Sequence, residues 1–154
     1  KAGSRAALEP MGMPAVKNSQ LPPPADLPGQ SVGQAELGDG VFVVRSLDAP
    51  PAGLREESGD GETYLGVSAR TPYNRYPLAL MSLSATVSGD DGTRFDGPME
   101  PVLHPEFGYH YGVVVDELAS GDTLKITVDS PPGAARHEGY ETAFFEMDEA
   151  TIDV

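Results

Sequence analysis

Short segments of alternating apolar and polar residues follow one another along most of this chain, separated by turn-forming residues. Residues 40–47 (GVFVVRSL) are rich in β-branched side chains and end at Asp48-Ala49-Pro50-Pro51, which predicts a strand. Residues 63–69 alternate as a second strand. Residues 78–88 predict a third strand, whose continuously apolar face should point into a core. That face consists of Ala79, Met81, Leu83, Ala85 and Val87.

The pattern continues in the second half of the chain. Gly89-Asp90-Asp91-Gly92 has the chemistry of a hairpin turn and leads to a short strand at 93–95. A last strand, or pair of strands, is expected at 142–147 and 150–154. No long amphipathic helical pattern occurs. About seven short strands with frequent turns predict an all-β fold, an immunoglobulin-like antiparallel β-sandwich.

Residues 112–117 and 123–129 give a clear strand–turn–strand pattern, with Ala119-Ser120-Gly121-Asp122 as the turn. We expect these two strands to pair as a hairpin. His110 comes just before the first strand and His137 follows the second. Pairing would bring both histidines to the same end of the sandwich.

The first 30 residues carry many prolines and little hydrophobic periodicity. We interpret residues 1–30 as an extended Pro-rich N-terminal tail or tether, and residues 31–154 as one sandwich domain. Met11 and Met13 lie in this tail. They are either a thioether pair for Cu(I) or ordinary tail methionines.

The charge of the chain is strongly acidic. With 24 acidic and 10 basic residues, the formal net charge is −14. A Lys-poor acidic surface is typical of proteins that work in concentrated salt, although an ordinary acidic secreted domain remains open. A nucleic-acid partner is disfavoured, because no basic patch is present to neutralise phosphates.

The chain has no cysteine, which excludes disulfides, thiolate catalysis and Cys-ligated metal sites. No apolar run of about 18 residues predicts a transmembrane helix. The chain begins with Lys1 rather than Met. We expect an extracytoplasmic protein, secreted or tethered at the cell surface, whose signal segment is absent from this chain.

The candidate chemistry lies in the histidines. Imidazole is a common ligand for transition metals, and His104, His110 and His137 all fall between residues 98 and 145. Met99 and His104 precede the expected meeting point and are candidates to complete a metal site. The alternative is structural: His110 would stack between Tyr109 and Tyr111, and His137 would be an ordinary loop residue.

The loop Arg70-Thr71-Pro72-Tyr73-Asn74-Arg75-Tyr76-Pro77 concentrates two arginines and two tyrosines. Such a loop either grips an anion or stacks its side chains to cover an end of the sandwich.

Several motifs in order resemble a known family. These are Pro98-Met99-Glu100-Pro101, His110-Tyr111-Gly112, Pro131-Pro132 and Ala135-Arg136-His137-Glu138. Together they resemble the periplasmic copper- and iron-binding accessory proteins of bacterial ferrous-iron uptake. Residues 71–77, 108–112 and 135–142 resemble more closely an uncharacterised haloarchaeal secreted group of that type.

The resemblance implies export, homodimerisation and a Cu(II) site made by His and Met ligands with a carboxylate nearby. His110 and His137 match the family's histidine ligands. Met99 lies farther from His110 than the family's methionine lies from its histidine, and His104 is a substitute. The family's further His and Glu on an early strand have no counterpart here.

Two functions follow. One is a secreted protein that binds copper or iron and assists uptake, with a membrane iron permease as a partner. The other is a non-enzymatic binding or structural module of the cell envelope that has lost the metal site. No catalytic residues are assigned: neither a nucleophile elbow nor an H-E-x-x-H motif is present, so an enzyme is not expected.

Overall fold

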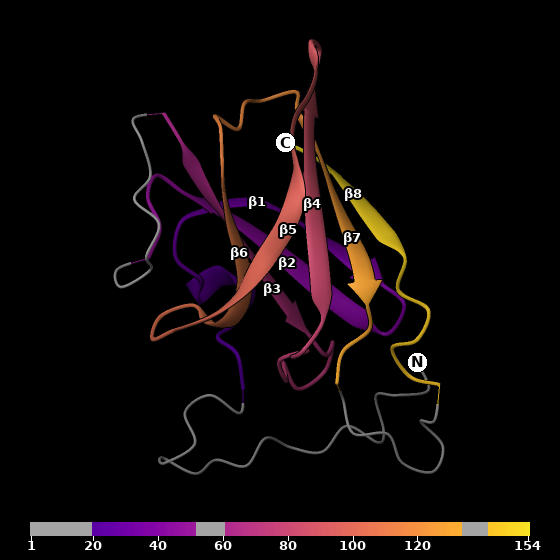
Figure 1. Ribbon diagram of the computed structural model, residues 1–154. Coiled ribbons are helices and arrows are strands. Elements are labelled where there is room, and N and C mark those ends of the chain that lie inside the picture. The colour runs from indigo at the N-terminus through magenta and orange to yellow at the C-terminus, as the bar shows by residue number, and fades with distance from the viewer. Residues whose placement is uncertain (1–19, 52–60, 134–141) are drawn as a thin grey trace.

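The computed structural model describes residues 20–51, 61–133 and 142–154, and these form one all-β unit (Figure 1). In these ranges no helix is long and apolar enough to cross a membrane. A short 3-10 helix, η2 (Pro24–Asp26), precedes the strands. The strands are β1 (Gln30–Leu37), β2 (Gly40–Leu47), β3 (Thr63–Arg70), β4 (Ser82–Gly89), β5 (Gly92–His104), β6 (Gly108–Val115), β7 (Thr123–Ser130) and β8 (Glu149–Asp153).

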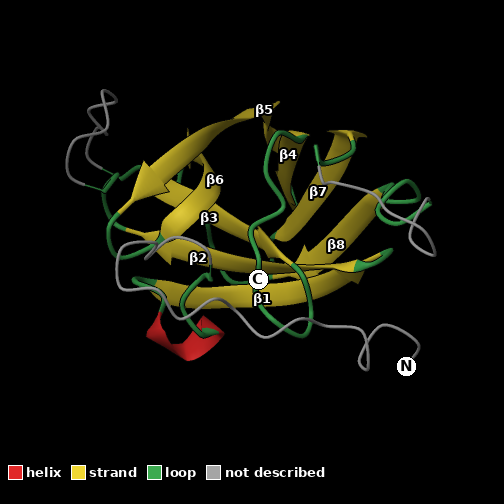
Figure 2. Ribbon diagram, turned by 90° about the horizontal axis from the view of Figure 1, so that it is seen from below, coloured by secondary structure: helices red, strands yellow, loops and turns green. Residues whose placement is uncertain are grey.

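The strands follow the order β1-β2-β3-β6-β5-β4-β7-β8, and every pairing is antiparallel. Strand β5 bends across the molecule, so that one layer holds β1, β2, β3 and β6 and the other holds β4, β7 and β8 (Figure 2). The outer strands approach each other where the Ile152 side chain packs against Gly33, which leaves no room for a Cβ there. The predicted all-β antiparallel sandwich is confirmed.

Strand β5 is far longer than the short strand predicted at 93–95. It continues through Pro98 and Pro101, two residues that normally end a strand. Its first part pairs only with β4, up to Met99, and its second part pairs only with β6, from Glu100 onward. Each part therefore has a free edge, where a proline costs no ladder hydrogen bond.

Strand β4 is shorter than the predicted 78–88, because the chain turns before Ser82. Leu80 adopts a left-handed backbone conformation with φ of 61° and is 76% exposed. The Tyr111 hydroxyl of β6 donates to the Leu78 carbonyl at 2.8 Å and accepts from the Met81 N–H at 3.0 Å, which fixes this turn. The predicted core face is confirmed from Met81 onward.

The predicted hairpin between 112–117 and 123–129 is wrong. β6 pairs with β3 and β5, whereas β7 pairs with β4 and β8, so the two strands lie in opposite layers. The turn between them joins the two layers and is held by Asp122. Its carboxylate accepts from the Ala119 N–H at 2.6 Å and pairs with Arg94 of β5.

The ends of the domain also differ from the expected pattern. Residues 142–147 contain no strand, and β8 alone forms the C-terminal edge. β1 was not predicted, because its sequence, QSVGQAEL, is mostly polar and it is largely exposed. Residues 20–30 of the predicted tail pack on the domain, with Leu21 and Leu27 buried. The extended form of the tail stays a prediction, since residues 1–19 lie outside the described ranges.

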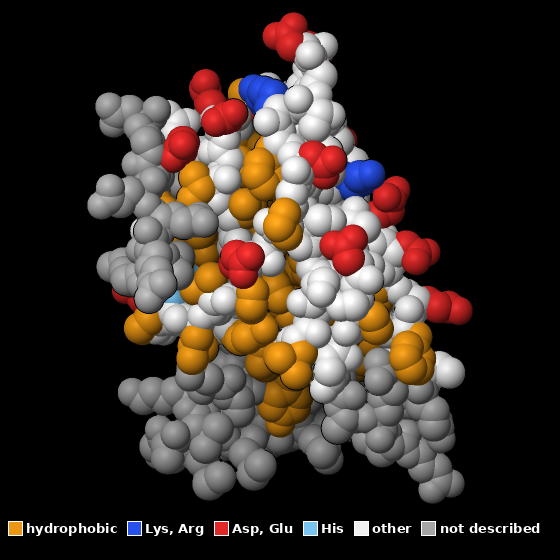
Figure 3. Space-filling model, in the orientation of Figure 1, with side chains coloured by type: hydrophobic (Ala, Val, Ile, Leu, Met, Phe, Trp, Pro, Cys, Tyr) orange, Lys and Arg blue, Asp and Glu red, His pale blue; other side chains and the backbone are white. Residues whose placement is uncertain are grey.

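The main core lies between the two layers. Its members come from all eight strands and include Phe42, Leu65, Leu83, Tyr111 and Ile126. At about 25 cal/mol per Å² of apolar area, burial of these side chains is the dominant favourable term for the fold. Acidic side chains are scattered over the surface in Figure 3, with few Lys or Arg among them.

Candidate binding site around His110

The site lies on the outer face of the β3–β6 layer. Val67 of β3 and Tyr111 of β6 are paired, and both side chains point into the main core. The residues that precede them, Gly66 and His110, therefore lie on the opposite, outer face. This outer face is not open to solvent. The Pro-rich segment 20–29, called the strap below, crosses it and buries Leu21 and Leu27.

His110 is enclosed on every side, with 0% of its surface exposed. Its Nδ1 lies 3.1 Å from the Gly108 carbonyl oxygen and its Nε2 lies 2.8 Å from the Tyr64 hydroxyl. A carbonyl only accepts, so Nδ1 carries the proton and Nε2 accepts from Tyr64. The Phe107 ring stacks on the imidazole, with centroids 4.1 Å apart and planes 24° apart.

These surroundings keep the imidazole neutral. The pKa of His110 is lowered to about 4, chiefly because burial penalises the charged ring. The hydrogen bond to Gly108 opposes the shift, and the charge of His104 adds to it. His110 is thus a neutral, hydrogen-bonded member of a packed cluster at physiological pH.

Two glycines make room for this cluster. A Cβ on Gly66 would lie 2.6 Å from the Phe107 ring, and a Cβ on Gly112 would collide with the Tyr64 hydroxyl. The Phe107 ring therefore lies over Gly66 and the Tyr64 phenol lies over Gly112. Because real Cβ atoms almost never approach so closely, the small residues are required by the packing of the two rings.

The strap is held by arginines rather than by carboxylates. Arg45 of β2 donates from Nη2 to the Leu27 and Gly29 carbonyls, at 2.7 Å each, and from Nε to Pro28 at 3.2 Å. Arg70 of β3 donates to the Pro22 carbonyl and to Ser68. The planar guanidinium suits such contacts, since it offers five donors in a fixed geometry.

Three of the four predicted metal ligands lie in the described structure, and Met99 is separated from the two described histidines. His104, at the end of β5, is near His110 and on the same outer face. Met99 points the opposite way, into the main core, and is 5% exposed. His137 lies outside the described residues, as do Met11 and Met13, so their role stays a prediction.

The residues around His110 do not fit a metal ion. Both ring nitrogens already have partners, and Phe107 covers the ring face. Within the described ranges, no group of three or more His, Cys, Asp or Glu side chains gathers as a ligand set. The cluster of His110, Tyr64 and Phe107 stabilises the outer face of the sheet, and Phe107 provides a surface on which Leu27 of the strap packs.

Tyr64, Ser68 and Arg70 were not predicted as parts of this site. Tyr64 and Ser68 are alternate residues of the predicted strand, which should face solvent in a two-layer sandwich, and Arg70 begins the loop predicted after that strand. The sequence did contain one indication of this cluster. Gly66 and Gly112 lie within strands, where a glycine often marks the close approach of another group.

Comparison with solved structures supports the fold. FetP of uropathogenic Escherichia coli strain F11 superposes with a TM-score of 0.62 at 14% identity, covering 80% of this chain and 91% of that chain. A copper-bound FetP variant gives 0.63 at 15% identity, covering 81% and 95%. Copper-reconstituted P19 from Campylobacter jejuni gives 0.60 at 15% identity, covering 81% of this chain and 94% of that chain.

At these identities the likeness establishes a shared fold. No curated protein matches the sequence. One family does match, over residues 25–153, which includes the second half of the strap and all eight strands. The chain therefore belongs to the family described as a domain of unknown function, DUF7350.

Proposed function

We propose that this chain is a non-enzymatic, extracytoplasmic binding module that has the fold of copper-bound periplasmic-type proteins but does not use His110 as a metal ligand. The observation that carries the proposal is the sealed imidazole. A ligand must present a free lone pair, and Nε2 of His110 already accepts from Tyr64 inside a packed, unexposed cluster.

The cost of freeing His110 supports this assignment. Coordination at Nε2 would break the buried hydrogen bond that Tyr64 donates to the ring, and an intramolecular hydrogen bond typically contributes about 0.5–1.5 kcal/mol to stability. Phe107 would also have to move away from the face of the ring. The two hydrogen bonds and the stacked ring thus favour a structural role for His110 over metal coordination.

A second candidate is a secreted copper- or iron-binding protein that assists uptake, with a membrane permease and a second copy of the chain as partners. Its support is the accessible ring of His104. His104 is half-buried, and its Nδ1 accepts from the Glu106 N–H at 3.3 Å, which leaves Nε2 as the ligand atom.

The deciding experiment is calorimetric titration of Cu(II) into metal-free protein, comparing the wild type with a His104→Ala/His137→Ala variant. This pair is more informative than His110→Ala, since removing a buried, hydrogen-bonded ring destabilises the fold whether or not metal binds. A Met11→Leu/Met13→Leu variant separates any contribution from the tail.

We expect no stoichiometric Cu(II) binding by the wild type and the same melting temperature before and after metal removal. One tight copper per chain that disappears in the double-histidine variant would establish the second candidate instead. Elemental analysis of protein purified from its native host provides the same distinction without added metal.

A further inference from the structure

The arginines of this acidic protein are distributed unevenly. The described residues include four of them, Arg45, Arg70, Arg75 and Arg94. Arg94 pairs with Asp122, whereas the other three donate to backbone carbonyls of the strap. Positive charge without a carboxylate partner therefore gathers at one face of a chain whose net charge is −14.

Arg70 and Arg75 form the centre of this positive region. Arg70 is 2% exposed, and its Nε has no hydrogen-bond partner in the part of the chain that the structure describes. The pKa of Arg70 is lowered to about 10, first by burial and then by the charge of Arg75. Two guanidinium groups thus repel each other where burial already penalises charge, an arrangement that an anion would relieve.

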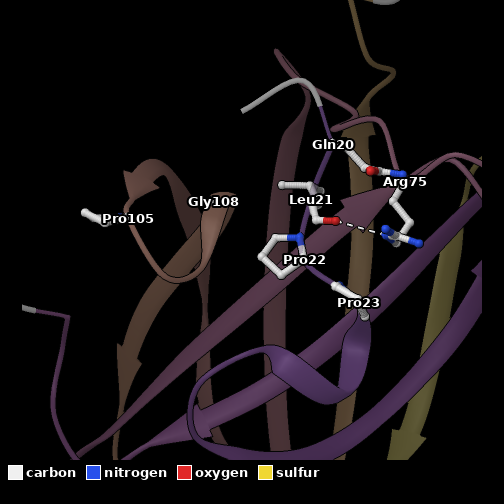
Figure 4. Close-up of a pocket in the computed structure, with 7 residues that line it drawn as sticks. All are labelled: Gln20, Leu21, Pro22, Pro23, Arg75, Pro105 and Gly108. Carbon is white, nitrogen blue, oxygen red and sulfur yellow. Dashed lines mark hydrogen bonds between the residues drawn. The ribbon is translucent and has the colours of Figure 1, made fainter. Parts of the chain in front are cut away.

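Arg75 also faces a cavity. The cavity has a volume of about 240 Å³ and is lined by Gln20, Leu21, Pro22, Pro23, Arg75, Pro105 and Gly108. Figure 4 shows Arg75 on one side of it and Pro105 and Gly108 on the other, with the strap between them. Arg75 has a left-handed backbone with φ of 52°, an unfavourable conformation for a residue with a side chain.

The Arg75 side chain is only partly engaged. Its Nε donates to the Leu21 carbonyl at 3.0 Å (Figure 4), and among the described residues its two Nη groups have no partner. Arg70 donates to the next carbonyl of the strap, that of Pro22. The two positive charges therefore hold neighbouring peptide groups that form one wall of the cavity.

We propose that this cavity is a binding site for a small oxyanion, a carboxylate or a phosphate group, contacted by Arg75 and favoured by the positive charge of Arg70 behind it. A guanidinium with two free Nη groups matches the geometry of such anions. The volume is below the roughly 300–1,000 Å³ of pockets for drug-sized ligands, so a small anion fits better than a large cofactor. This proposal does not depend on whether the protein binds a metal ion.

The test is titration of inorganic phosphate and of citrate into the full chain, in metal-free buffer at constant ionic strength set with KCl. We expect saturable binding of at least one of the two, with a rise in melting temperature beyond that in chloride alone. Phosphate against citrate distinguishes a tetrahedral anion from a carboxylate.

The most informative variant adds a negative charge at the cavity and leaves both arginines unchanged. Pro23 is exposed on the strap with φ of −51° and ψ of 149°, a conformation that Glu and Gln also adopt. Pro23→Glu should weaken anion binding at least tenfold by supplying an internal carboxylate. The neutral Pro23→Gln should stay within about twofold, as should the distant charge control Lys125→Gln.

Absence of saturable binding for both anions would overturn the proposal, and so would equal affinity in the Pro23→Glu and Pro23→Gln variants. Arg75→Gln should abolish binding. Because that change also removes the contact with Leu21, the Pro23 pair remains the decisive comparison if the strap loosens.

Discussion

At the scale of single residues, the protonation state of His110 follows from what surrounds it. Burial opposes the charged ring, and the Gly108 carbonyl and the Tyr64 hydroxyl together fix one neutral tautomer. His104, on the same face but half-buried, lacks this enclosure. Two histidines that look alike in the sequence therefore have different chemistry.

The lowered pKa of His110 makes stability depend on pH. Between its ordinary value of about 6.5 and the folded value of about 4, the unfolded chain binds the proton and the folded chain does not. Stability must therefore fall as pH falls through this window. A shift from 6.5 to 4 corresponds to a loss of about 3 kcal/mol.

The measurement is the free energy of unfolding in urea at pH values from 7 to 4, for the wild type and for His110→Gln. Gln keeps a donor and an acceptor but does not titrate. We expect the wild type to lose more stability than the variant across this range. Parallel curves would show that His110 is free to take up a proton in the folded state.

At the scale of elements, the strap determines the character of β3. Every residue of β3 after Thr63 is buried, because the main core covers one face and the strap with Phe107 covers the other. A strand buried on both faces is typical of three-layer proteins. Here a Pro-rich segment with one turn of 3-10 helix serves as the third layer.

The strap should contribute measurably to stability. Leu27 is 3% exposed and packs against Val43 and Phe107, so Leu27→Ala should cost about 2–5 kcal/mol of unfolding free energy. Leu103→Ala is the matched control, since Leu103 is 62% exposed and its truncation should change stability by about 0.5 kcal/mol or less.

Chemical denaturation of both leucine variants, followed by tyrosine fluorescence, compares them directly. Equal losses in the two variants would mean that the strap does not stay on the outer face in solution.

At the scale of the whole molecule, charge repulsion opposes the compact state. The excess of 24 acidic over 10 basic residues is spread over the surface, and few ion pairs in the described structure offset it. Salt shortens the range of this repulsion, from a Debye length of about 10 Å at 0.1 M to about 3 Å at 1 M.

The melting temperature should therefore rise between 0.1 M and 1 M KCl. Asp90→Asn/Asp91→Asn is a suitable comparison, because both residues are exposed at the β4–β5 turn and Asn also suits such a turn. This variant should melt higher in low salt and respond less to added KCl. A melting temperature that is flat or falls with KCl would contradict a destabilising role for the acidic surface.

Part of this protein was predictable because the relevant forces are local. The β-branched run at 40–47 and the alternation at 123–129 specify strands, and the apolar face from Met81 to Val87 identifies core residues. His110 was recognisable as a residue of interest. Its partner Tyr64, 46 residues away, was not, since nothing in local periodicity reports which strands become neighbours.

The amino-acid sequence by itself determined the all-β class, most strand positions and the acidic surface, because side-chain alternation, turn chemistry and charge are properties of short segments. The tertiary structure alone decided that β6 and β7 separate into different layers, that β5 runs through two prolines and that the strap packs on Val43 and Phe107. These features depend on which distant groups satisfy each other's hydrogen bonds and fill each other's space. Only the complete packing arrangement fixes those choices.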